Sequence, residues 1–467
     1  MSMTDRKGRS ARVGFAALRR LIRPLAALIA SVLAATASAA EPRMPNILVF
    51  LADDLGYGEL SCQGNPEIPT PHIDAIAKAG IRFTQGYVSG PYCSPTRAGL
   101  MTGRYQTRFG HEFNSVAEIY GLSRNETTMA ERLKALGYAT ALVGKWHLGQ
   151  KPGVLPMDRG FDEFYGTLNN TSFFNPRLFI DSRVSSDVRE MKDPEFYTTL
   201  AYARRSADWL ERNREKPWFL YLAFNAVHAP LQAPRSYLDR FPDIRDERRR
   251  TYAAMTAAMD VAVGQVMARL RELGQEEDTL VFFLSDNGGP TASTTSRNDP
   301  LRGFKITTWE GGVRVPFLVQ WKEKIPAGKT DDRPVIQLDI LPTALAAAGA
   351  PVDPSWKLDG VDLLPFLIGE NPARPHETLY WRMGPQWAIR HGDLKLVAGR
   401  EGGRILPPGL YDVVRDPGET HDLTATHPDK AKGLRALWEE WDAEQAPPAA
   451  AADAADAAAK RKAGARP

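Results

Sequence analysis

Short apolar runs alternate along the chain with longer stretches in which apolar residues recur at helical spacing. Within the runs, polar and apolar positions do not alternate, which is typical of parallel strands buried on both faces. The runs cover residues 47–51, 139–143, 218–222, 280–284 and 315–319. This pattern predicts an α/β fold in which a large, mostly parallel but mixed sheet is flanked by helices.

The stretches between these runs carry apolar residues on one helical face. They predict helices over residues 71–79, 128–136, 198–211 and 250–273. After about residue 375 the segments become shorter and are separated by turn residues. They lie at 387–390, 394–397 and 410–412 and precede a helical pattern near 430–444. This part is predicted to form a small C-terminal antiparallel sheet with one helix.

A chain of 467 residues exceeds what one hydrophobic core usually supports. We therefore expect a main α/β domain over residues 43–375 and the small sheet subdomain over 376–445. From residue 446 the sequence is rich in Ala and Pro and has no apolar pattern that could bury itself. Residues 446–467 are therefore predicted to be a disordered tail.

The first 40 residues have the pattern of a cleaved export signal. Basic residues precede the apolar run 25–33, and small residues follow it up to Ala40. Cleavage is expected after Ala39 or Ala40, which predicts a periplasmic or secreted bacterial protein. The run is shorter than the roughly 20 residues of a spanning helix, so a stable membrane anchor is the weaker alternative. The pair Arg19-Arg20 leaves twin-arginine export open beside the general route.

The charge of the chain is nearly balanced, with 59 basic and 56 acidic residues and a formal net charge of +3. Such a balance gives no reason to expect nucleic acid as a partner. Two cysteines cannot form a disulfide framework in a chain of this length. We interpret Cys62 as a buried or half-buried thiol, whereas the surroundings of Cys93 call for a separate account.

Four of the apolar runs end in polar residues that are suited to chemistry. These residues are Asp53 and Asp54, then Lys145 and His147, then Asn225 and His228, and finally Asp286 and Asn287. The carboxyl ends of parallel strands meet at one edge of a sheet, where ligands bind in such folds. A single acidic residue at a strand end is more often a cap or turn residue, but four such ends together predict a site.

The acidic part of this set has the composition of a metal site. Asp53, Asp54, Asp286 and Asn287 supply three carboxylates and an amide oxygen. An all-oxygen donor set suits a hard cation such as Ca²⁺ or Mg²⁺. Such a cation polarises an anionic ester and activates a bound hydroxyl.

The segment around Cys93 predicts an anion-binding helix start. Ser94 is expected to cap a helix whose first residue is Pro95, so Cys93 would lie just before the free N–H groups. Arg97, one turn into the helix, offers a planar fork of donors for a tetrahedral oxyanion. From these residues alone, Cys93 is either a thiolate nucleophile of low pKa or a partly buried cysteine beside a capped helix.

The sequence Cys93-Ser94-Pro95-Thr96-Arg97, followed by Leu100, Thr102 and Gly103, resembles the signature of the type I, formylglycine-dependent sulfatases. These arylsulfatase-like enzymes belong to the alkaline phosphatase superfamily. Residues 144–149 resemble the second signature of that family. The likeness continues in order through residues 53–58, 225–230, 285–289, 303–305 and 310–316, and the C-terminal region also resembles the family's small sheet subdomain.

The resemblance implies that a formylglycine-generating enzyme oxidises Cys93 to Cα-formylglycine, which replaces the thiolate interpretation. The hydrated aldehyde, a gem-diol, would then attack the sulfur of a sulfate monoester. Asp53, Asp54, Asp286 and Asn287 would hold Ca²⁺, with Mg²⁺ as the alternative, together with an oxygen of modified Cys93.

Further roles follow from the same resemblance. Arg97 would orient the diol, and Lys145 and Lys305 would hold the sulfate oxygens. His228 would protonate the leaving alcohol, and His147 would assist breakdown of the intermediate. The expected substrate is a sulfated carbohydrate, with small aryl sulfates as surrogates.

Other interpretations stay open at this point. The chain could be a phosphate or phosphonate ester hydrolase of the same superfamily, or a sulfated-glycan-binding protein without turnover. Lys145 and Lys305 could be solvated surface residues, and His228 a core histidine. Three residues that follow the Cys93 helix could line the pocket or be purely structural, namely Arg104, His111 and Glu112.

Overall fold

The computed structural model describes residues 44–193 and 195–449. The predicted export signal and all of the predicted tail beyond residue 449 lie outside the described residues. Residues from Pro45 onward form one unit, separate from residues 1–44. Within the described residues, no helix is long and apolar enough to cross a membrane.

A ten-stranded mixed sheet forms the centre of this unit, in the order β11-β2-β10-β9-β1-β8-β4-β5-β6-β7. β1 pairs in parallel with β8 and β9, and β4 pairs in parallel with β8 and β5. β10 runs antiparallel to β9 and β2. The predicted mixed sheet is therefore confirmed. Its strands are β1 Asn46–Ala52, β2 Ile81–Phe83, β4 Ala139–Lys145, β5 Glu163–Thr167, β6 Phe179–Asp181, β7 Ser185–Arg189, β8 Trp218–Ala223, β9 Thr279–Ser285, β10 Phe317–Gln320 and β11 Lys329–Asp331.

All five predicted strands match to within two residues at each end. The fifth, β10, begins at Phe317 rather than at residue 315, because Val315 pairs with Gly86 and Pro316 has no N–H to donate to a ladder. The central strands are buried along their whole length. Two further short strands, β3 Gly86–Tyr87 and β12 Val335–Ile336, pair beside this sheet.

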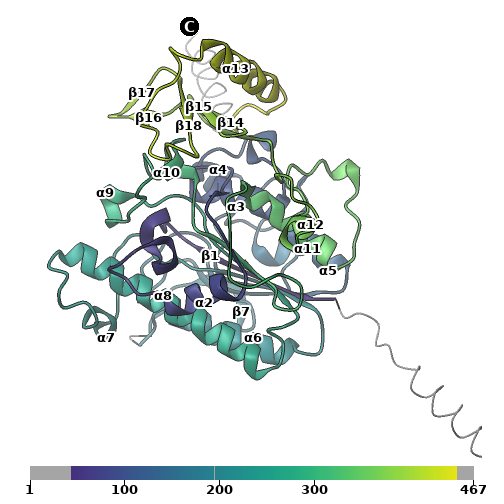
Figure 1. The fold of residues 1–467 in the computed structure, drawn as a ribbon. Helices are drawn as coiled ribbons and strands as arrows, with labels where there is room; N and C mark the ends of the chain where they lie inside the picture. The colour runs from purple at the N-terminus through teal and green to yellow at the C-terminus, as the bar shows by residue number, and fades with distance from the viewer. Residues whose placement is uncertain (1–43, 194, 450–467) are drawn as a thin grey trace, which may run out of the picture. The chain divides into compact units, whose positions relative to one another are not determined.

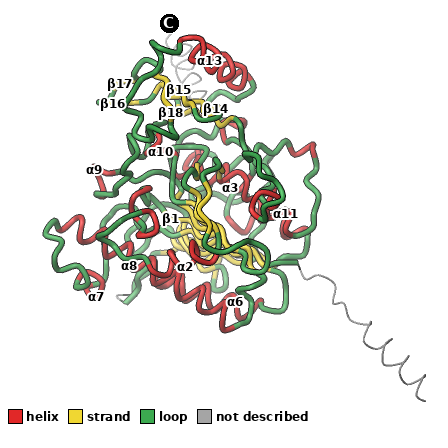
Figure 2. The backbone as a smooth tube through the Cα atoms, viewed as in Figure 1, coloured by secondary structure: helices red, strands yellow, loops and turns green. Residues whose placement is uncertain are grey.

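Helices cover both sides of the sheet, which Figure 2 shows as a yellow layer between red helices. On one side α2, α6 and α8 pack on each other and on the strands, and on the other lie α3 and α11 (Figure 1). Thr128 caps α5 in a capping box with Glu131. The helices are α2 Pro71–Ala79, α3 Cys93–Thr102, α4 Asn114–Ile119, α5 Met129–Ala135, α6 Thr198–Asn213, α7 Arg235–Leu238, α8 Glu247–Glu272, α9 Thr291–Thr294, α10 Glu310–Val313, α11 Ile340–Ala347, α12 Leu364–Leu367 and α13 Pro428–Ala443.

The C-terminal region forms the predicted small antiparallel sheet, in the order β13-β14-β15-β18. These strands are β13 Thr378–Met383, β14 Gln386–His391, β15 Leu394–Ala398 and β18 Gly409–Asp412, and α13 packs against them. β13 and the separate hairpin of β16 Arg400–Glu401 and β17 Arg404–Ile405 were not predicted from the sequence. Tyr87 and Trp309 from the earlier part of the chain complete the core of this sheet.

The chain leaves α13 along a defined path. Ala446 N–H donates to the Thr107 carbonyl, and Ala449 N–H donates to the Gly110 carbonyl. The first four residues of the segment predicted as a disordered tail are thus bound to the loop after α3. Backbone groups supply both bonds, so the side-chain pattern contained no signal for them.

Candidate active site

The polar residues at the strand ends converge as the α/β pattern predicted. Asp53 and Asp54 follow β1, Lys145 ends β4, and Asp286 follows β9. Asp53 N–H donates to the Ala226 carbonyl and Asp286 N–H to the Ala52 carbonyl, which ties the ends of β1, β8 and β9 to one another. The site therefore lies outside the carboxyl ends of the central strands.

Arg97 connects the carboxylates to α3, the helix on which it lies. Its Nε and Nη2 lie 3.1 Å and 2.8 Å from Asp286 Oδ2, and Nη2 lies 3.3 Å from Asp53 Oδ2. Its Nη1 donates to the Lys145 carbonyl at 2.9 Å. All of these side chains are fully buried. These hydrogen bonds therefore hold the Arg97 side chain in one position, and they also hold the carboxylates that accept them.

Two lysines lie on the carboxylates. Lys145 Nζ is 2.5 Å from Asp53 Oδ2, and Lys305 Nζ is 2.6 Å from Asp54 Oδ1 and 3.2 Å from Cys93 Sγ. Burial alone would raise the pKa of Asp53, but the positive charges around it, led by Lys145, hold that pKa well below its usual range. Both lysines are buried, so the interpretation as solvated surface residues is wrong.

Cys93 is itself the first residue of α3, so the expected cap was wrong. Ser94 lies inside the helix, where its Oγ is 2.6 Å from His111 Nε2. Asn114 Oδ1 accepts the Ser94 N–H at 3.0 Å and thereby performs the capping expected of Ser94. The sequence could not show this because Asn114 lies a further 20 residues along.

The environment of Cys93 opposes a thiolate. Burial raises the pKa of its thiol to about 12, and attraction from Lys145 and Lys305 does not offset that effect. The carboxylates of Asp286 and Asp53 raise the pKa further. The unmodified side chain would therefore be a protonated thiol near neutral pH, which disfavours the thiolate alternative.

The donor atoms suit a cation. One ligand atom each from Asp53, Asp54, Cys93 and His228 lie within 4.8 Å of one another. Asn287 Oδ1 is buried without a hydrogen-bond partner, while its Nδ2 donates to Asp54 Oδ1 at 2.7 Å. A buried amide oxygen without a partner carries a desolvation cost that a bound ion would remove. Each of the three carboxylates also accepts from the protein: Arg97 binds Asp286 Oδ2, Lys145 binds Asp53 Oδ2 and Lys305 binds Asp54 Oδ1.

The two histidines lie in different settings. His228 Nε2 is 3.4 Å from Asp54 Oδ2, and its side chain is 19% exposed toward the cavity described below. The interpretation of His228 as a core histidine is therefore wrong. His147 is buried, and neither ring nitrogen has a partner. Burial, with Lys145 and Arg97 nearby, holds the pKa of His147 well below its usual value, so its ring is neutral near pH 7.

Three of the seven non-glycine residues with a positive φ among the described residues lie in this region. Asp54, His147 and Ile306 adopt positive φ values of 64°, 58° and 67°, a conformation that costs non-glycine residues about 1–3 kcal/mol each. Gly144, at φ 118°, leaves no space for a side chain, because a Cβ there would lie 1.8 Å from the Ala223 carbonyl oxygen. The local fold therefore places Lys145 at a position that only a preceding glycine permits.

A cavity of about 460 Å³ opens onto the cluster. Asp54, His228 and Lys305 form its floor. Its rim also includes Phe304, which lies in the motif at residues 303–305. The sequence alone indicated no role for the other rim residues, which are Tyr92, Asn114, Asn170, Ser293 and Ile306.

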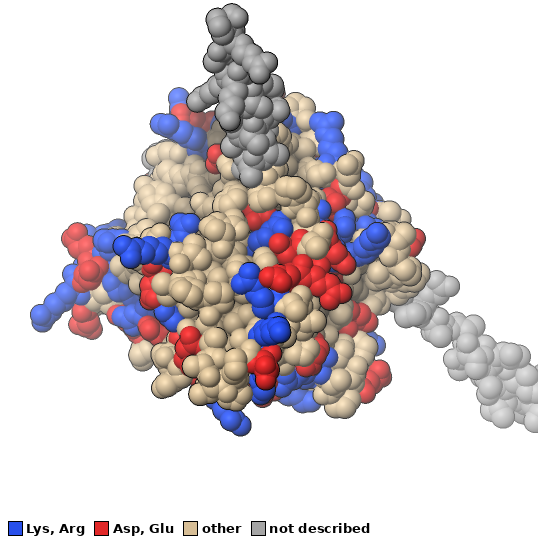
Figure 3. All heavy atoms as spheres, turned by 90° about the horizontal axis from the view of Figure 1, so that it is seen from above, with Lys and Arg blue, Asp and Glu red and all other residues tan. Residues whose placement is uncertain are grey.

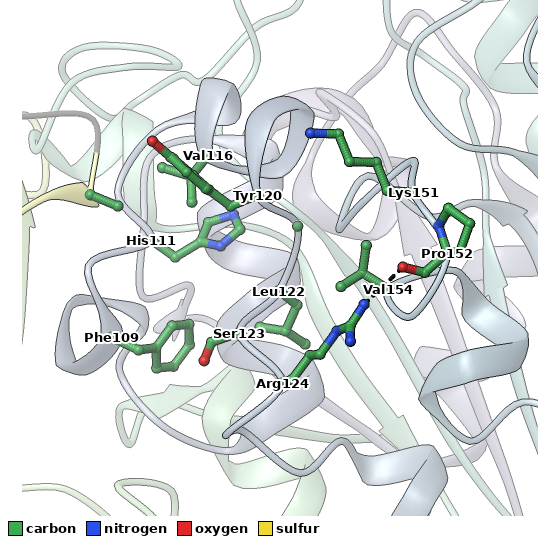
Figure 4. A pocket seen from close by; sticks show the side chains of 12 residues that line it. Phe109, His111, Val116, Tyr120, Leu122, Ser123, Arg124, Lys151, Pro152 and Val154 are labelled. Atoms are coloured by element: carbon green, nitrogen blue, oxygen red, sulfur yellow. Dashed lines mark hydrogen bonds between the residues drawn. The ribbon is translucent and has the colours of Figure 1, made fainter. Parts of the chain in front are cut away.

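A second cavity, of about 470 Å³, lies beside α4 and is separate from the catalytic cluster (Figure 4). His111 lines it together with apolar side chains, and Arg124 reaches the Pro152 carbonyl across it. Elsewhere Arg104 pairs with Glu126, and Glu112 pairs with Arg382. The three residues after the Cys93 helix thus make structural contacts and do not line the catalytic cavity.

Charges of both signs are intermingled over the face drawn in Figure 3. On the described part of that face, basic side chains form no continuous field. This arrangement matches the near balance of 59 basic and 56 acidic residues. Any selection of an anionic ligand must therefore come from local groups such as Lys145 and Lys305.

Known proteins place this geometry in one family. Residues 45–350 match the Sulfatase family. Arylsulfatase A of Homo sapiens is 34% identical over 442 residues, covering 84% of this chain and 85% of that protein. N-acetylgalactosamine-6-sulfatase of Canis lupus familiaris is 34% identical over 385 residues, covering 77% and 72%.

A solved structure agrees with these relatives. The crystal structure of Ps i-CgsB in complex with k-i-k-neocarrahexaose is similar at a TM-score of 0.79 and 33% identity, covering 87% of this chain and 94% of that one. The chain belongs to the sulfatase family of the alkaline phosphatase superfamily and is a sulfuric ester hydrolase.

Proposed function

We propose that this enzyme removes sulfate from sulfated carbohydrates, using formylglycine derived from Cys93 and a divalent cation. The observation that carries the proposal is the convergence of Cys93, the carboxylates and the two lysines in one buried cluster. Asp54, His228 and Lys305 of this cluster line a cavity.

Asp53, Asp54, Asp286 and Asn287 are the proposed ligands of the cation. Their oxygens favour Ca²⁺, with Mg²⁺ as the alternative, and the partnerless Asn287 Oδ1 supports such a site. The bound ion would polarise the sulfate group and favour an ionised hydroxyl at position 93. His228 also offers a ligand atom within 4.8 Å of those of Asp53, Asp54 and Cys93, but its partial exposure to the cavity fits contact with the substrate better.

The remaining side chains act on the substrate and on protons. Lys145 and Lys305 would hold sulfate oxygens and stabilise the charge that grows on them as the ester bond breaks. Arg97 keeps the carboxylates and the start of α3 in register. His228 Nε2 would donate a proton to the leaving alcohol. His147, whose ring is neutral and has no partner, would accept a proton from position 93 when sulfate departs.

The preference for carbohydrate rests on similar proteins. N-acetylgalactosamine-6-sulfatase and Ps i-CgsB, which was crystallised with a neocarrahexaose, are both more than 30% identical to this chain. A phosphonate monoester hydrolase is also similar in structure, at a TM-score of 0.64, but its 22% identity shows only the shared fold. The reaction assigned here therefore depends on the site residues.

Maturation and location form part of the same proposal. A formylglycine-generating enzyme would convert Cys93 in the expressing cell, and residues 1–40 would direct export to the periplasm or medium. We also retain the division into a main domain over 43–375, a small subdomain over 376–445 and a C-terminal tail.

The test is hydrolysis by the matured enzyme of three matched nitrophenyl esters: sulfate, phosphate and phosphonate. We expect the sulfate ester to have the highest kcat/KM by a wide margin. A panel of sulfated sugars, scored by released sulfate, then tests the carbohydrate assignment. A preference for the phosphate or phosphonate ester would contradict the proposed reaction.

A further inference from the structure

A small cavity of about 230 Å³ adjoins the catalytic one. Phe304 and Ile306 line both cavities, so these two residues form the ridge between them. The far wall of the small cavity is the β16–β17 hairpin, which contributes residues 400–403. Figure 1 shows this hairpin above α10, on the same side of the view as α9, whose Ala292 and Ser293 line the catalytic cavity.

The ridge is rigid and partly apolar. Phe304 is 43% exposed although the next residue, Lys305, is buried against Asp54. The loop is held on both sides, because Ile306 N–H donates to the Pro91 carbonyl and Gln386 Nε2 donates to the Ile306 carbonyl. The backbone that turns Lys305 inward therefore presents the Phe304 ring outward in a fixed position. An exposed aromatic ring at the edge of a polar site suits the apolar face of a sugar ring.

The hairpin adds positive charge to the small cavity. Arg400 is exposed, lines the cavity and forms no ion pair within the described residues. Glu401, the acidic residue in the lining, is neutralised by Arg302 at 2.6 Å. Arg302 in turn stacks on Trp309. The guanidinium of Arg400 is thus left available for an anionic group.

We propose that this cavity is a subsite for the sugar next to the one that loses its sulfate, and that Arg400 selects a neighbour carrying a carboxylate or sulfate. This inference rests on the proposed function. The Phe304 ridge separates the two sugars, and a cavity of this volume holds one ring rather than a chain. Arg400 acts as a specificity residue and does not reach the reacting atoms.

The test measures competitive inhibition of 4-nitrophenyl sulfate hydrolysis by the matured, metal-loaded enzyme. The inhibitors are N-acetylgalactosamine 6-sulfate and the chondroitin 6-sulfate disaccharide, whose second sugar is a uronate. A sulfated sugar that the enzyme hydrolyses also competes with 4-nitrophenyl sulfate. The inhibition constant can therefore be measured whether or not the sugar is a substrate. We expect the disaccharide to inhibit about fivefold more tightly, the size of one partly exposed ion pair.

Variants locate the effect on the hairpin. Arg400→Gln should reduce the ratio of the two inhibition constants to near one, and Arg400→Lys should retain most of it. Arg404→Gln is the matched control, since Arg404 lies on the same hairpin but outside the cavity lining, and it should leave the ratio unchanged. The ratio cancels losses of catalysis or folding that affect both inhibitors alike.

Equal inhibition by the two sugars in the wild-type enzyme, inhibition by neither, or an unchanged ratio in Arg400→Gln would overturn the subsite. A failure of the proposed function would look different, because then 4-nitrophenyl sulfate itself would not be hydrolysed.

Discussion

Two buried clusters of charge lie in this enzyme, and they are built from the same kinds of residue. The active-site cluster contains three carboxylates facing Arg97, Lys145 and Lys305. The second, here called the Lys395 cluster, joins Lys395 to Glu310 at 2.9 Å and to Glu419 at 3.0 Å. It also includes Arg314, Arg390 and the hydroxyl of Tyr87.

The difference between the clusters lies in whether their charged groups reach a cavity. Lys395, Glu310 and Glu419 are completely enclosed and bind the small C-terminal sheet to α10. The active-site cluster instead opens through Asp54, Lys305 and His228 to a cavity. Buried atoms without a hydrogen-bond partner occur in both clusters, namely Asn287 Oδ1 and the ring nitrogens of His147 in the first and Arg390 Nη2 in the second. Burial, ion pairing and partnerless atoms alone therefore do not mark function, whereas access to a cavity does.

Removal of the metal should give the largest difference between the clusters, because only the active-site cluster is proposed to bind it. Exhaustive chelation is expected to reduce aryl sulfate turnover by about 10³ or more, because an ion supplies several kcal/mol of transition-state stabilisation. Added Ca²⁺ or Mg²⁺ should restore the rate. The Lys395 cluster does not bind the metal in this account, so it should stay intact after chelation. Far-UV circular dichroism should therefore show a folded apoprotein. Full activity after complete chelation would contradict the metal assignment.

Replacement of His228 tests proton transfer to the leaving group. General acid catalysis is worth about 10²–10⁴ in rate, and it matters most for alcohols that leave poorly. His228→Ala should therefore lower kcat/KM on a sugar sulfate by a factor in that range, and on 4-nitrophenyl sulfate by clearly less. Equal losses on both substrates would assign His228 to sulfate positioning instead.

The two lysines allow a matched pair of substitutions. Lys305→Met should cost about 10²–10³ in kcat, the usual loss when one transition-state donor is removed, and should leave the fold intact. Lys395→Met should leave Glu310 and Glu419 buried without their shared cation and cost about 3–5 kcal/mol of stability. Denaturant unfolding and turnover are measured on both variants. Similar losses of stability and of turnover in the two variants would contradict the distinction between the clusters.

Glu419 should give the smallest effect, seen as a pH dependence of stability. Burial raises the pKa of Glu419 to about 7, although Lys395 opposes the shift and Glu310 adds to it. The folded state therefore holds a proton that the unfolded state releases near pH 4.5. Stability should fall by about 2–3 kcal/mol as the pH rises from about 4.5 to 7. In Glu419→Gln this part of the dependence should disappear, and an identical pH profile in the variant would contradict the shift.

The sequence predicted the parts of the molecule that depend on periodicity and strand ends. The central strands, four helices and the convergence of Asp53, Lys145 and Asp286 follow from buried runs in a parallel sheet. The contacts between distant segments could not be predicted. Examples are the capping of Ser94 by Asn114, the hydrogen bonds of Ala446 and Ala449, and the β16–β17 hairpin beside Phe304. Each of these contacts depends on how loops pack, and loop packing produces no periodic pattern of apolar residues in the sequence.

The central claim is that catalysis requires a modified Cys93, and peptide mass spectrometry joined to activity tests it most directly. Several preparations with different degrees of conversion are digested, and the Cys93 peptide is quantified as thiol or as aldehyde, which has lost one sulfur and two hydrogens and gained one oxygen. A Cys93→Ser variant provides the unconverted control. The account predicts that specific activity toward 4-nitrophenyl sulfate rises in proportion to the aldehyde fraction and is absent from the serine variant. Full turnover by preparations in which Cys93 remains a thiol would contradict it.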